Sequence, residues 1–549
     1  MRLSVIALAV PFLLLPLMPQ AVAQPKETLR IGMVQFPPDM HPNITNTSIK
    51  DYILATSRRA MTGFTDTGRV ICILCTEVPT IANGRAKVVE RADGARGMEV
   101  LFTLKPDLFW ADGERVTARD VAFAHDVDRA FSVPPTVEKI EALNDHDVKV
   151  TLKIVRYDFD RSAPAPLSEH IEGPIFRAAR DPLDYGQRSL FNRKPEEPGL
   201  WMGPYRIAEF RPNESVALVP NPHWKGRVPH FQRITMRLVE NTSALQANLL
   251  SGDVDLVAPG NLGLTLDQHI ALARSQSARF NITYVPSVSY EHWAVNLDNP
   301  LLRDRRVRQA LQMSIDRSTI VKRVFEGKFE VADSFLHPTQ FGRNAEMKTW
   351  PYDPARARAL LAEAGFRPGA DGILVSAQGE RFALDFTTTA GNRVRELVAQ
   401  VVQTQLKAVG IDLAIHNEPA RVMFGETLRK RAFKGVVQFQ SDPPLDWVPY
   451  TTFHSTYIPR AENNWTGTNY SGFASPEMDQ ALADAWAALE EAPRAAAWRR
   501  ILEIAGNELP EINLFFTSTA VLTPGWLTGV APEGRWGGAT SWVENWRVR

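Results

Sequence analysis

Strand-like and helix-like segments alternate along almost the whole chain, and this alternation narrows the possible fold more than any other pattern. Capping residues mark the starts of helices: Thr117 with Asp120 three residues later, and the pairs Asp353-Pro354 and Ser475-Pro476. Apolar or alternating runs typical of strands lie between the helices, at residues 29–36, 98–106, 146–155, 214–220, 233–239 and 253–258. Since no strict repeat relates these segments, we expect a mixed α/β and α+β organisation in more than one lobe.

Residues 305–325, which follow Asp304, are typical of a helix with one apolar stripe (Val307, Leu311 and Ile315). We expect the arginines at its start to form a solvated face rather than a binding patch (Arg305, Arg306 and Arg308).

The N-terminus has the pattern of a secretory leader. Arg2 precedes an apolar run, and Ala21-Val22-Ala23 is a small-residue cleavage site. The run is short and contains two prolines, which disfavours a retained membrane helix. No cysteine follows it, so we expect no lipid anchor. The sequence predicts a signal peptide at residues 1–23 and a soluble, exported chain beyond it.

The charge balance argues against polyanionic partners. The chain of 549 residues carries 62 basic and 62 acidic side chains, and removing residues 1–23 removes only Arg2. A surface this evenly balanced creates no field that would attract nucleic acid. The remaining length suits two to four domains at ~100–200 residues each.

Cys72 and Cys75 are the only cysteines in the sequence. In a straight strand, three residue steps span ~10 Å, which is too far for a disulfide. A zinc site would need two more ligands, and the sequence contains no second cysteine pair. Two structural thiols and a strained disulfide both remain open.

Common catalytic patterns are absent from the sequence. It contains no G-x-S-x-G, S-x-x-K or H-E-x-x-H motif and no phosphate-binding loop. Its eleven histidines are scattered. These absences disfavour the known hydrolase classes, and we expect neither an enzyme nor a bound cofactor or metal.

Several segments, in order, resemble the extracytoplasmic solute-binding proteins of ABC importers, in the oligopeptide/dipeptide-binding family (family 5). They are residues 100–126, 202–226, 245–257, 293–317 and 352–366. The resemblance implies a two-lobed periplasmic-binding-protein clamshell of type II, with mixed sheets flanked by helices and an extra inserted domain. The implied division is lobe 1 at residues 24–75, 201–293 and 516–549, the inserted domain at 76–200, and lobe 2 at 294–515. It also implies a periplasmic location, with a membrane permease and ATPase subunits as partners. We further expect a monomer.

The heptapeptide SDPPLDW, residues 441–447, contains the principal candidate for ligand binding. In peptide-binding relatives, an aspartate in a similar acidic and aromatic loop holds the α-ammonium group of the peptide. The resemblance assigns this role to Asp442, with Asp446 as the alternative and Trp447 beside them. Two prolines would stiffen the segment, so that ordering the carboxylate costs little entropy. The competing interpretation is a solvent-exposed turn that Asp442 initiates.

Four further residues are candidates for the cleft. Trp465 and Tyr470 lie in a polar, glycine-containing loop that relatives direct towards the ligand. Tyr290 and Asn296 lie where the chain is expected to enter lobe 2, close to Trp293, which we assign to the core.

Three functions are compatible with these features. The first is an importer subunit that binds short peptides through their main chain and amino terminus. The second keeps the fold but binds another solute, such as an oligosaccharide, an opine, haem or a metal chelate. The third is an exported hydrolase with an unrecognised site.

Overall fold

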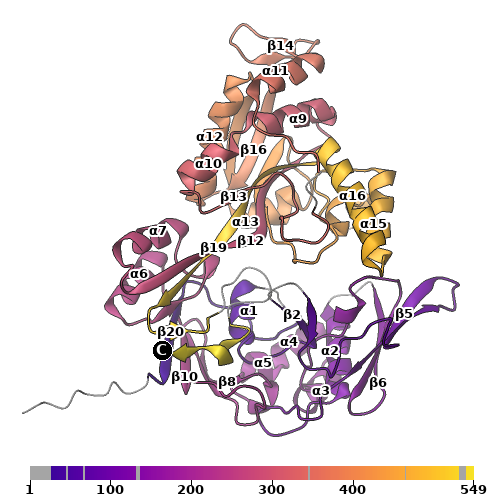
Figure 1. Cartoon of the computed structure of the whole chain (residues 1–549), viewed down its shortest axis with the longest axis vertical. Helices are drawn as coiled ribbons and strands as arrows, with labels where there is room; N and C mark the ends of the chain where they lie inside the picture. The colour runs from indigo at the N-terminus through magenta and orange to yellow at the C-terminus, as the bar shows by residue number, and fades with distance from the viewer. Residues whose placement is uncertain are drawn as a thin grey trace, which may run out of the picture.

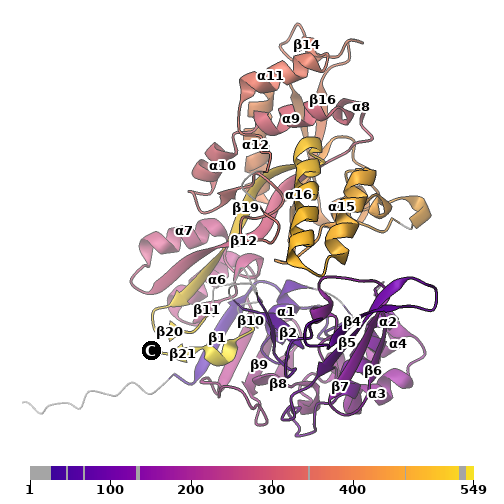
Figure 2. The ribbon, with the colours of Figure 1, turned by 45° about the vertical axis from the view of Figure 1, so that its right-hand side comes forward.

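The computed structural model describes residues 26–44, 47–65, 69–131, 136–343, 347–463, 465–530 and 540–549, without the side chain of Arg421. The predicted leader at residues 1–23 lies outside the described residues. Figures 1 and 2 show a lower and an upper lobe, joined by the long strands β12 (Phe280–Val295) and β19 (Glu511–Pro524). The predicted two-lobed α/β architecture is confirmed.

The first sheet of the lower lobe has the strand order β11-β1-β10-β9-β8. Its strands are β1 (Thr28–Met33), β8 (Tyr205–Arg211), β9 (Ser215–Pro220), β10 (Arg233–Leu238) and β11 (Leu256–Val257). Leu29, Ile31 and Met33 alternate along β1 and are fully buried in the core of this sheet. The associated helices are α1 (Ser48–Leu54), α6 (Thr242–Ser251) and α7 (Leu266–Ser275).

A second sheet of the lower lobe has the order β4-β5-β7-β6. It comprises β4 (Ala86–Glu90), β5 (Arg96–Thr103), β6 (Val137–Ala142) and β7 (Asp147–Leu152). Helix α2 (Ala118–Phe131) joins the two lower cores, because Val121 packs into the core of this sheet while Phe123 and Val127 pack into that of the first. Three short helices follow: α3 (Glu169–Arg177), α4 (Pro182–Arg188) and α5 (Leu190–Arg193).

The upper lobe is built on a sheet of order β13-β19-β12-β18-β16-β17. Besides β12 and β19, it contains β13 (Glu330–Val331), β16 (Ala383–Thr389), β17 (Asp412–Glu418) and β18 (Val436–Ser441). Its main helices are α9 (Arg305–Ser314), α10 (Arg317–Val324), α11 (Pro354–Glu363), α12 (Arg393–Ala408), α15 (Pro476–Ala487) and α16 (Glu491–Glu508). Shorter segments are α8 (Pro300–Arg303), α13 (Ala420–Val422), α14 (Tyr450–Phe453), β14 (Arg367–Pro368) and β15 (Leu374–Val375).

The connection between the lobes is a pair of antiparallel strands rather than a loop. Strands β12 and β19 pair from Phe280–Pro524 to Ala294–Glu511, with register shifts between Pro286 and Tyr290 and between Glu291 and His292. The lobe boundaries expected from the sequence, at 293/294 and 515/516, fall inside these two strands. Near the C-terminus, β20 (Leu527–Thr528) pairs with β21 (Arg547–Val548) in the lower lobe.

The predicted helix starts at Asp353 and Ser475 are confirmed. Each side chain accepts a hydrogen bond from the backbone N–H three residues later, at 2.9 Å from Arg356 and 3.2 Å from Met478.

The single helix expected over residues 305–325 is wrong. Asp316 accepts a hydrogen bond from the Thr319 N–H (2.9 Å) and begins α10 as a second helix. The solvated face expected for its arginines is also wrong for Arg308. Arg308 is 2% exposed and its guanidinium pairs with Glu508 at 3.0 Å, so it belongs to the packing of α9 against the end of α16.

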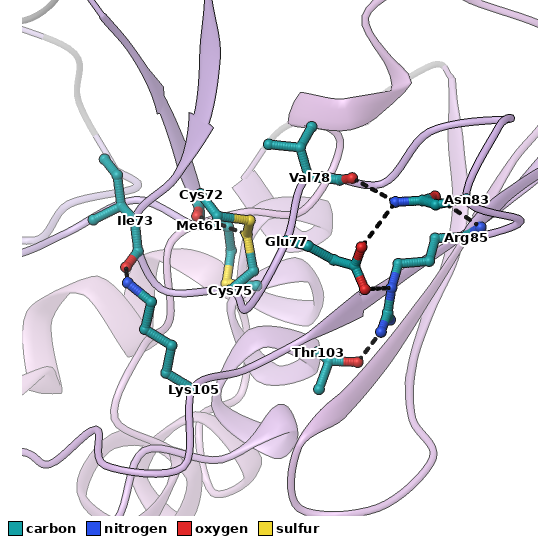
Figure 3. Close-up of a disulfide and its surroundings, with 10 residues drawn as sticks. All are labelled: Met61, Cys72, Ile73, Cys75, Glu77, Val78, Asn83, Arg85, Thr103 and Lys105. Atoms are coloured by element: carbon teal, nitrogen blue, oxygen red, sulfur yellow. Dashed lines mark hydrogen bonds and ion pairs between the residues drawn. A yellow bond between two sulfur atoms is a disulfide. The ribbon is translucent and has the colours of Figure 1, made fainter.

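Cys72 and Cys75 form a disulfide, drawn in Figure 3. The straight strand assumed from the sequence ends at Cys72, the last residue of β3 (Val70–Cys72), and the chain bends at Ile73 and Leu74. The bend brings the two Cα atoms to 5.1 Å, within the usual range for a disulfide. Strand β3 pairs with β2 (Thr62–Phe64), so the disulfide lies at the end of a short hairpin.

Candidate ligand-binding site

A cavity of about 1490 Å³ lies between the two lobes. Its upper wall is one face of the sheet formed by β19, β12 and β18, and its lower wall contains α1, the β2–β3 hairpin and the loop before α7. The lining residues from the three strands and the segment after β18 include Ser287, Ser289, Glu291, Gln438, Gln440, Asp442, Phe515, Thr517 and Thr519; Pro444, Leu445, Ser518 and Ala520 also contribute.

Strand geometry explains why these side chains face the cavity together. Successive side chains on a strand point to opposite faces, so residues two apart share a face. The register places Glu291 of β12 opposite both Gln440 of β18 and Phe515 of β19. The intervening residues Tyr290 and His292 are fully buried on the other face. The result is a largely polar wall rich in hydroxyl and amide groups.

Asp442 lies on this wall, directly after β18. Its side chain is exposed to the cavity, and one carboxylate oxygen accepts a hydrogen bond from Gln440 Nε2 at 2.7 Å. Among the described residues, no cationic side chain lies within 4.0 Å of this carboxylate. Asp442 therefore presents an uncompensated negative charge, held in place by a neighbouring amide and followed by Pro443 and Pro444.

Two other charged residues of the walls are paired within the protein. Glu291 Oε1 accepts hydrogen bonds from Arg395 Nε (2.9 Å) and Nη2 (2.6 Å). On the lower wall, Arg59 pairs with Glu544 at 2.7 Å. The charges within each pair largely cancel, so these residues shape the cavity but exert little electrostatic attraction on a ligand.

Asp446 does not line the cavity. Its carboxylate pairs with Arg161 at 3.0 Å and with Arg494 at 3.6 Å, and its backbone carbonyl accepts a hydrogen bond from the Tyr157 hydroxyl at 3.2 Å. Because Arg161 and Tyr157 belong to the lower lobe, Asp446 joins the two lobes. Neighbouring Trp447 is not part of the wall either, and packs edge-on against Phe335 with ring centroids 6.2 Å apart.

Tyr290 and Asn296 are also committed to packing. The Tyr290 ring is fully buried and its hydroxyl donates a hydrogen bond to Glu511 at 3.1 Å. The Asn296 amide is 6% exposed and donates to the Phe433 carbonyl. Trp293 is confirmed as a core residue, with its indole N–H bonded to Gln438 at 3.1 Å.

The two loop aromatics lie outside the wall in this conformation. Trp465 occupies a turn with φ of 58°. Tyr470 packs edge-on against Phe439 at 5.9 Å between ring centroids. Of the seven side chains expected from the sequence, the structure therefore brings only Asp442 to the cavity.

The cavity residues that sequence reasoning missed carry one visible signal. Polar side chains recur at every second position in residues 287–291 and in residues 438–442. That alternation indicates a polar strand face, but only the pairing of β12 with β18 shows that the two faces form one wall.

Comparison with known proteins is consistent with this architecture. The model for bacterial extracellular solute-binding proteins, family 5, matches residues 92–459. The chain belongs to this family. Members of family 5 are solute-binding proteins found outside the cytoplasm. Among the described residues, no helix combines the length and apolarity needed to span a bilayer.

Individual members of family 5 differ in what they bind. The oligopeptide-binding protein AppA of Bacillus subtilis is 27% identical over 461 residues, which cover 81% of this chain and 80% of AppA. An oligopeptide-binding protein of Thermus thermophilus, solved with a pentapeptide, is 26% identical with a TM-score of 0.74, over 95% of this chain and 97% of that one. NikZ of Campylobacter jejuni, solved with Ni(L-His), has the same TM-score of 0.74 at 22% identity, over 95% of this chain and 100% of NikZ, and shows a shared fold.

Proposed function

We propose that this protein is the periplasmic receptor of an ABC importer, and that it captures short peptides in the cavity between its lobes. The observation that carries the proposal is the unpaired Asp442 carboxylate on the cavity wall. Peptides with a free amino terminus carry the complementary ammonium group. Water is partly excluded between the lobes, and the attraction between the two charges is stronger there than in bulk solvent.

The size and polarity of the cavity fit a peptide. Its volume of 1490 Å³ exceeds the ~300–1,000 Å³ typical of a site for one drug-sized molecule. Hydroxyl and amide side chains on β12, β18 and β19 can bond the peptide main chain, which is common to all sequences. A receptor of this kind would accept varied side chains, with waters filling the unused space.

The remaining parts of the proposal concern the route of the peptide. The predicted leader would deliver the chain to the periplasm and be cleaved there. Loaded receptor would then dock on a membrane permease that cytoplasmic ATPase subunits drive. The oligopeptide-binding names of AppA and of the Thermus protein support peptide as cargo.

Calorimetry with matched peptides tests the role of Asp442. We expect a free short peptide to bind wild-type protein at least about tenfold more tightly than its N-acetylated form, since a hydrogen bond to a charged group contributes ~1.5–3 kcal/mol. Asp442→Asn should lose most of this preference. Asp484→Asn is the control, because Asp484 also accepts a hydrogen bond from a glutamine (Gln480, 2.8 Å) but lies outside the cavity wall, where it pairs with Arg500 at 3.0 Å. Equal affinity of wild-type protein for the free and acetylated peptides would refute the assignment.

A metal chelate is the second candidate, favoured by His269. This imidazole lines the cavity and is 1% exposed. Its Nδ1–H donates to the Thr265 carbonyl at 2.9 Å, while Nε2 has no hydrogen-bond partner among the described residues. Burial lowers the pKa of His269, so Nε2 keeps a free lone pair at neutral pH. Native mass spectrometry of freshly purified protein separates the two candidates by the mass of the retained ligand.

A further inference from the structure

Arg58 occupies the lower wall of the cavity, four residues after the end of α1. It is half-buried, and it stands next to a second arginine, Arg59. The two guanidinium groups differ in how many partners they have within the protein, and this difference indicates that Arg58 is available to bind a ligand.

Both terminal nitrogens of Arg59 are engaged within the protein, and only its buried Nε lacks a hydrogen-bond partner among the described residues. Its Nη1 donates to the carbonyls of Ala55 (2.6 Å) and Arg58 (2.8 Å), and its Nη2 pairs with Glu544 at 2.7 Å. The ring of Trp224 lies 5.3 Å from its guanidinium carbon. Arg59 therefore fastens the segment after α1 to the C-terminal part of the chain.

Arg58 has almost no partner. Its guanidinium makes one long hydrogen bond, from Nη2 to the Pro166 carbonyl at 3.4 Å. Within the described ranges, no carboxylate lies within 4.0 Å of its nitrogens; Asp51 and Asp128 attract it only from farther away. Most of its five N–H donors are thus unused at the edge of a cavity.

The backbone that carries Arg58 is held rigidly. The carbonyl of the preceding residue, Ser57, accepts hydrogen bonds from the N–H groups of Met202 (3.1 Å) and Gly203 (2.8 Å). Gly203 approaches so closely that an added Cβ would lie 2.7 Å from the Arg58 nitrogen. A fixed backbone limits the entropy that a ligand must remove when it orders the side chain.

Leaving this cation unpaired is costly. Burial lowers the pKa of Arg58 to about 10, which still leaves the group charged at neutral pH. A partly desolvated charge without a counter-ion destabilises a protein unless a ligand supplies the counter-ion. The planar guanidinium fork fits a carboxylate through two parallel hydrogen bonds.

We propose that Arg58 is the recognition site for a carboxylate group of the ligand. The inference rests on the proposed peptide-binding function and narrows its substrate class to peptides with a free C-terminus or an acidic side chain. Arg58 belongs to the lower lobe and Asp442 to the upper lobe, so one peptide would bind an anion of one lobe with its ammonium group and a cation of the other with its carboxylate.

Calorimetry with three forms of one short peptide tests this site: the free acid with neutral side chains, its C-terminal amide, and the amide with one glutamate. The Arg58→Gln variant removes the charge. Arg358→Gln is the matched control, because Arg358 also makes a single 3.4 Å hydrogen bond to a carbonyl (Ala408) but lies on the surface outside the cavity.

We expect wild-type protein and Arg358→Gln to bind the free acid, the glutamate amide, or both, at least about tenfold more tightly than the neutral amide. Whichever form is preferred identifies the source of the carboxylate. In Arg58→Gln the three affinities should converge on that of the neutral amide. Equal binding of all three forms by wild-type protein, or a preference retained in Arg58→Gln, would overturn the site while leaving peptide binding intact. If no form bound the wild-type protein, the proposed function itself would fail, and the inference with it.

Discussion

Glu511 is a buried carboxyl group at the start of β19, where three ionisable side chains meet. Tyr290 donates a hydrogen bond to its Oε2 at 3.1 Å, and His292 Nε2 lies 3.5 Å from its Oε1. Burial raises the pKa of Glu511 to about 8 and lowers the pKa of His292 to about 3. At neutral pH both groups are therefore uncharged.

This environment makes stability depend on pH. A group whose pKa is higher in the folded than in the unfolded state stabilises the fold fully below the unfolded value, and this contribution is lost as pH rises through the folded value. For Glu511, the contribution declines from about pH 4.5 to about pH 8. The glutamine in Glu511→Gln cannot ionise. The free energy of unfolding of the variant minus that of the wild-type protein should therefore increase with pH, by up to about 1.4 kcal/mol per pH unit in that window.

Urea denaturation at several pH values measures this difference. The exposed Glu503→Gln variant is the control and should follow the wild-type protein at every pH. Parallel wild-type and Glu511→Gln curves from pH 5 to 8 would contradict the prediction.

Among the secondary-structure elements, the β2–β3 hairpin is notable because it ends in a disulfide and also forms part of the cavity wall. Thr62, Phe64 and Ile73 line the cavity, and Figure 3 shows the disulfide beside the segment that leads to Lys105. Lys105 Nζ donates to the Ile73 carbonyl at 2.7 Å, which ties the hairpin to the second lower sheet. Neither cysteine lines the cavity, so the disulfide supports the hairpin from behind the wall.

Removing the disulfide should destabilise the protein modestly. The loop that it closes is short, and chain-entropy arguments give about 2 kcal/mol at 25 °C for such a loop. The Cys72→Ser/Cys75→Ala variant should therefore unfold at lower urea concentration than the wild-type protein under oxidising conditions. A thiol reductant should bring the wild-type protein to the level of the variant and leave the variant unchanged; an equal effect on both proteins would count against this account.

Local signals explain which elements were predictable. The caps at Asp353 and Ser475 determine helix starts within a few residues, so those starts were correct. The break before α10 was missed because Ile315 continues the apolar stripe of α9 while Asp316 already caps the next helix. The cavity wall depends on pairing between β12 and β18, which are far apart in sequence, and the partner of Arg308 lies on α16. No local pattern contains such distant pairings.

For the whole molecule, the contact between the lobes at Asp446 is the feature with mechanical consequences. Arg161 of the lower lobe and Arg494 of the upper lobe share its carboxylate. Beside them, the Tyr157 N–H donates to the Trp486 carbonyl at 2.9 Å. The lobes cannot separate at this edge without breaking the Asp446–Arg161 ion pair and the Tyr157–Trp486 hydrogen bond.

Asp446→Asn should shift the protein towards an open form, because it leaves Arg161 without its counter-ion across the lobes. We expect a larger radius of gyration in small-angle scattering without ligand. Ligand affinity should fall about threefold to tenfold, as the closed population decreases. Glu363→Gln, which breaks a 2.7 Å ion pair with Arg356 inside the upper lobe, should change neither quantity. An unchanged radius in Asp446→Asn would show that the contact does not hold the lobes together.

The paired strands β12 and β19 are both the connection between the lobes and part of the upper wall of the cavity. Ser287 and Ser289 lie at their irregular stretch, where a bend is easiest. Points near an axis of rotation move least. A ligand bound beside these strands would therefore keep its contacts with them while the outer parts of the lobes move. Ligand binding can therefore begin at the connecting strands, before the lobes close.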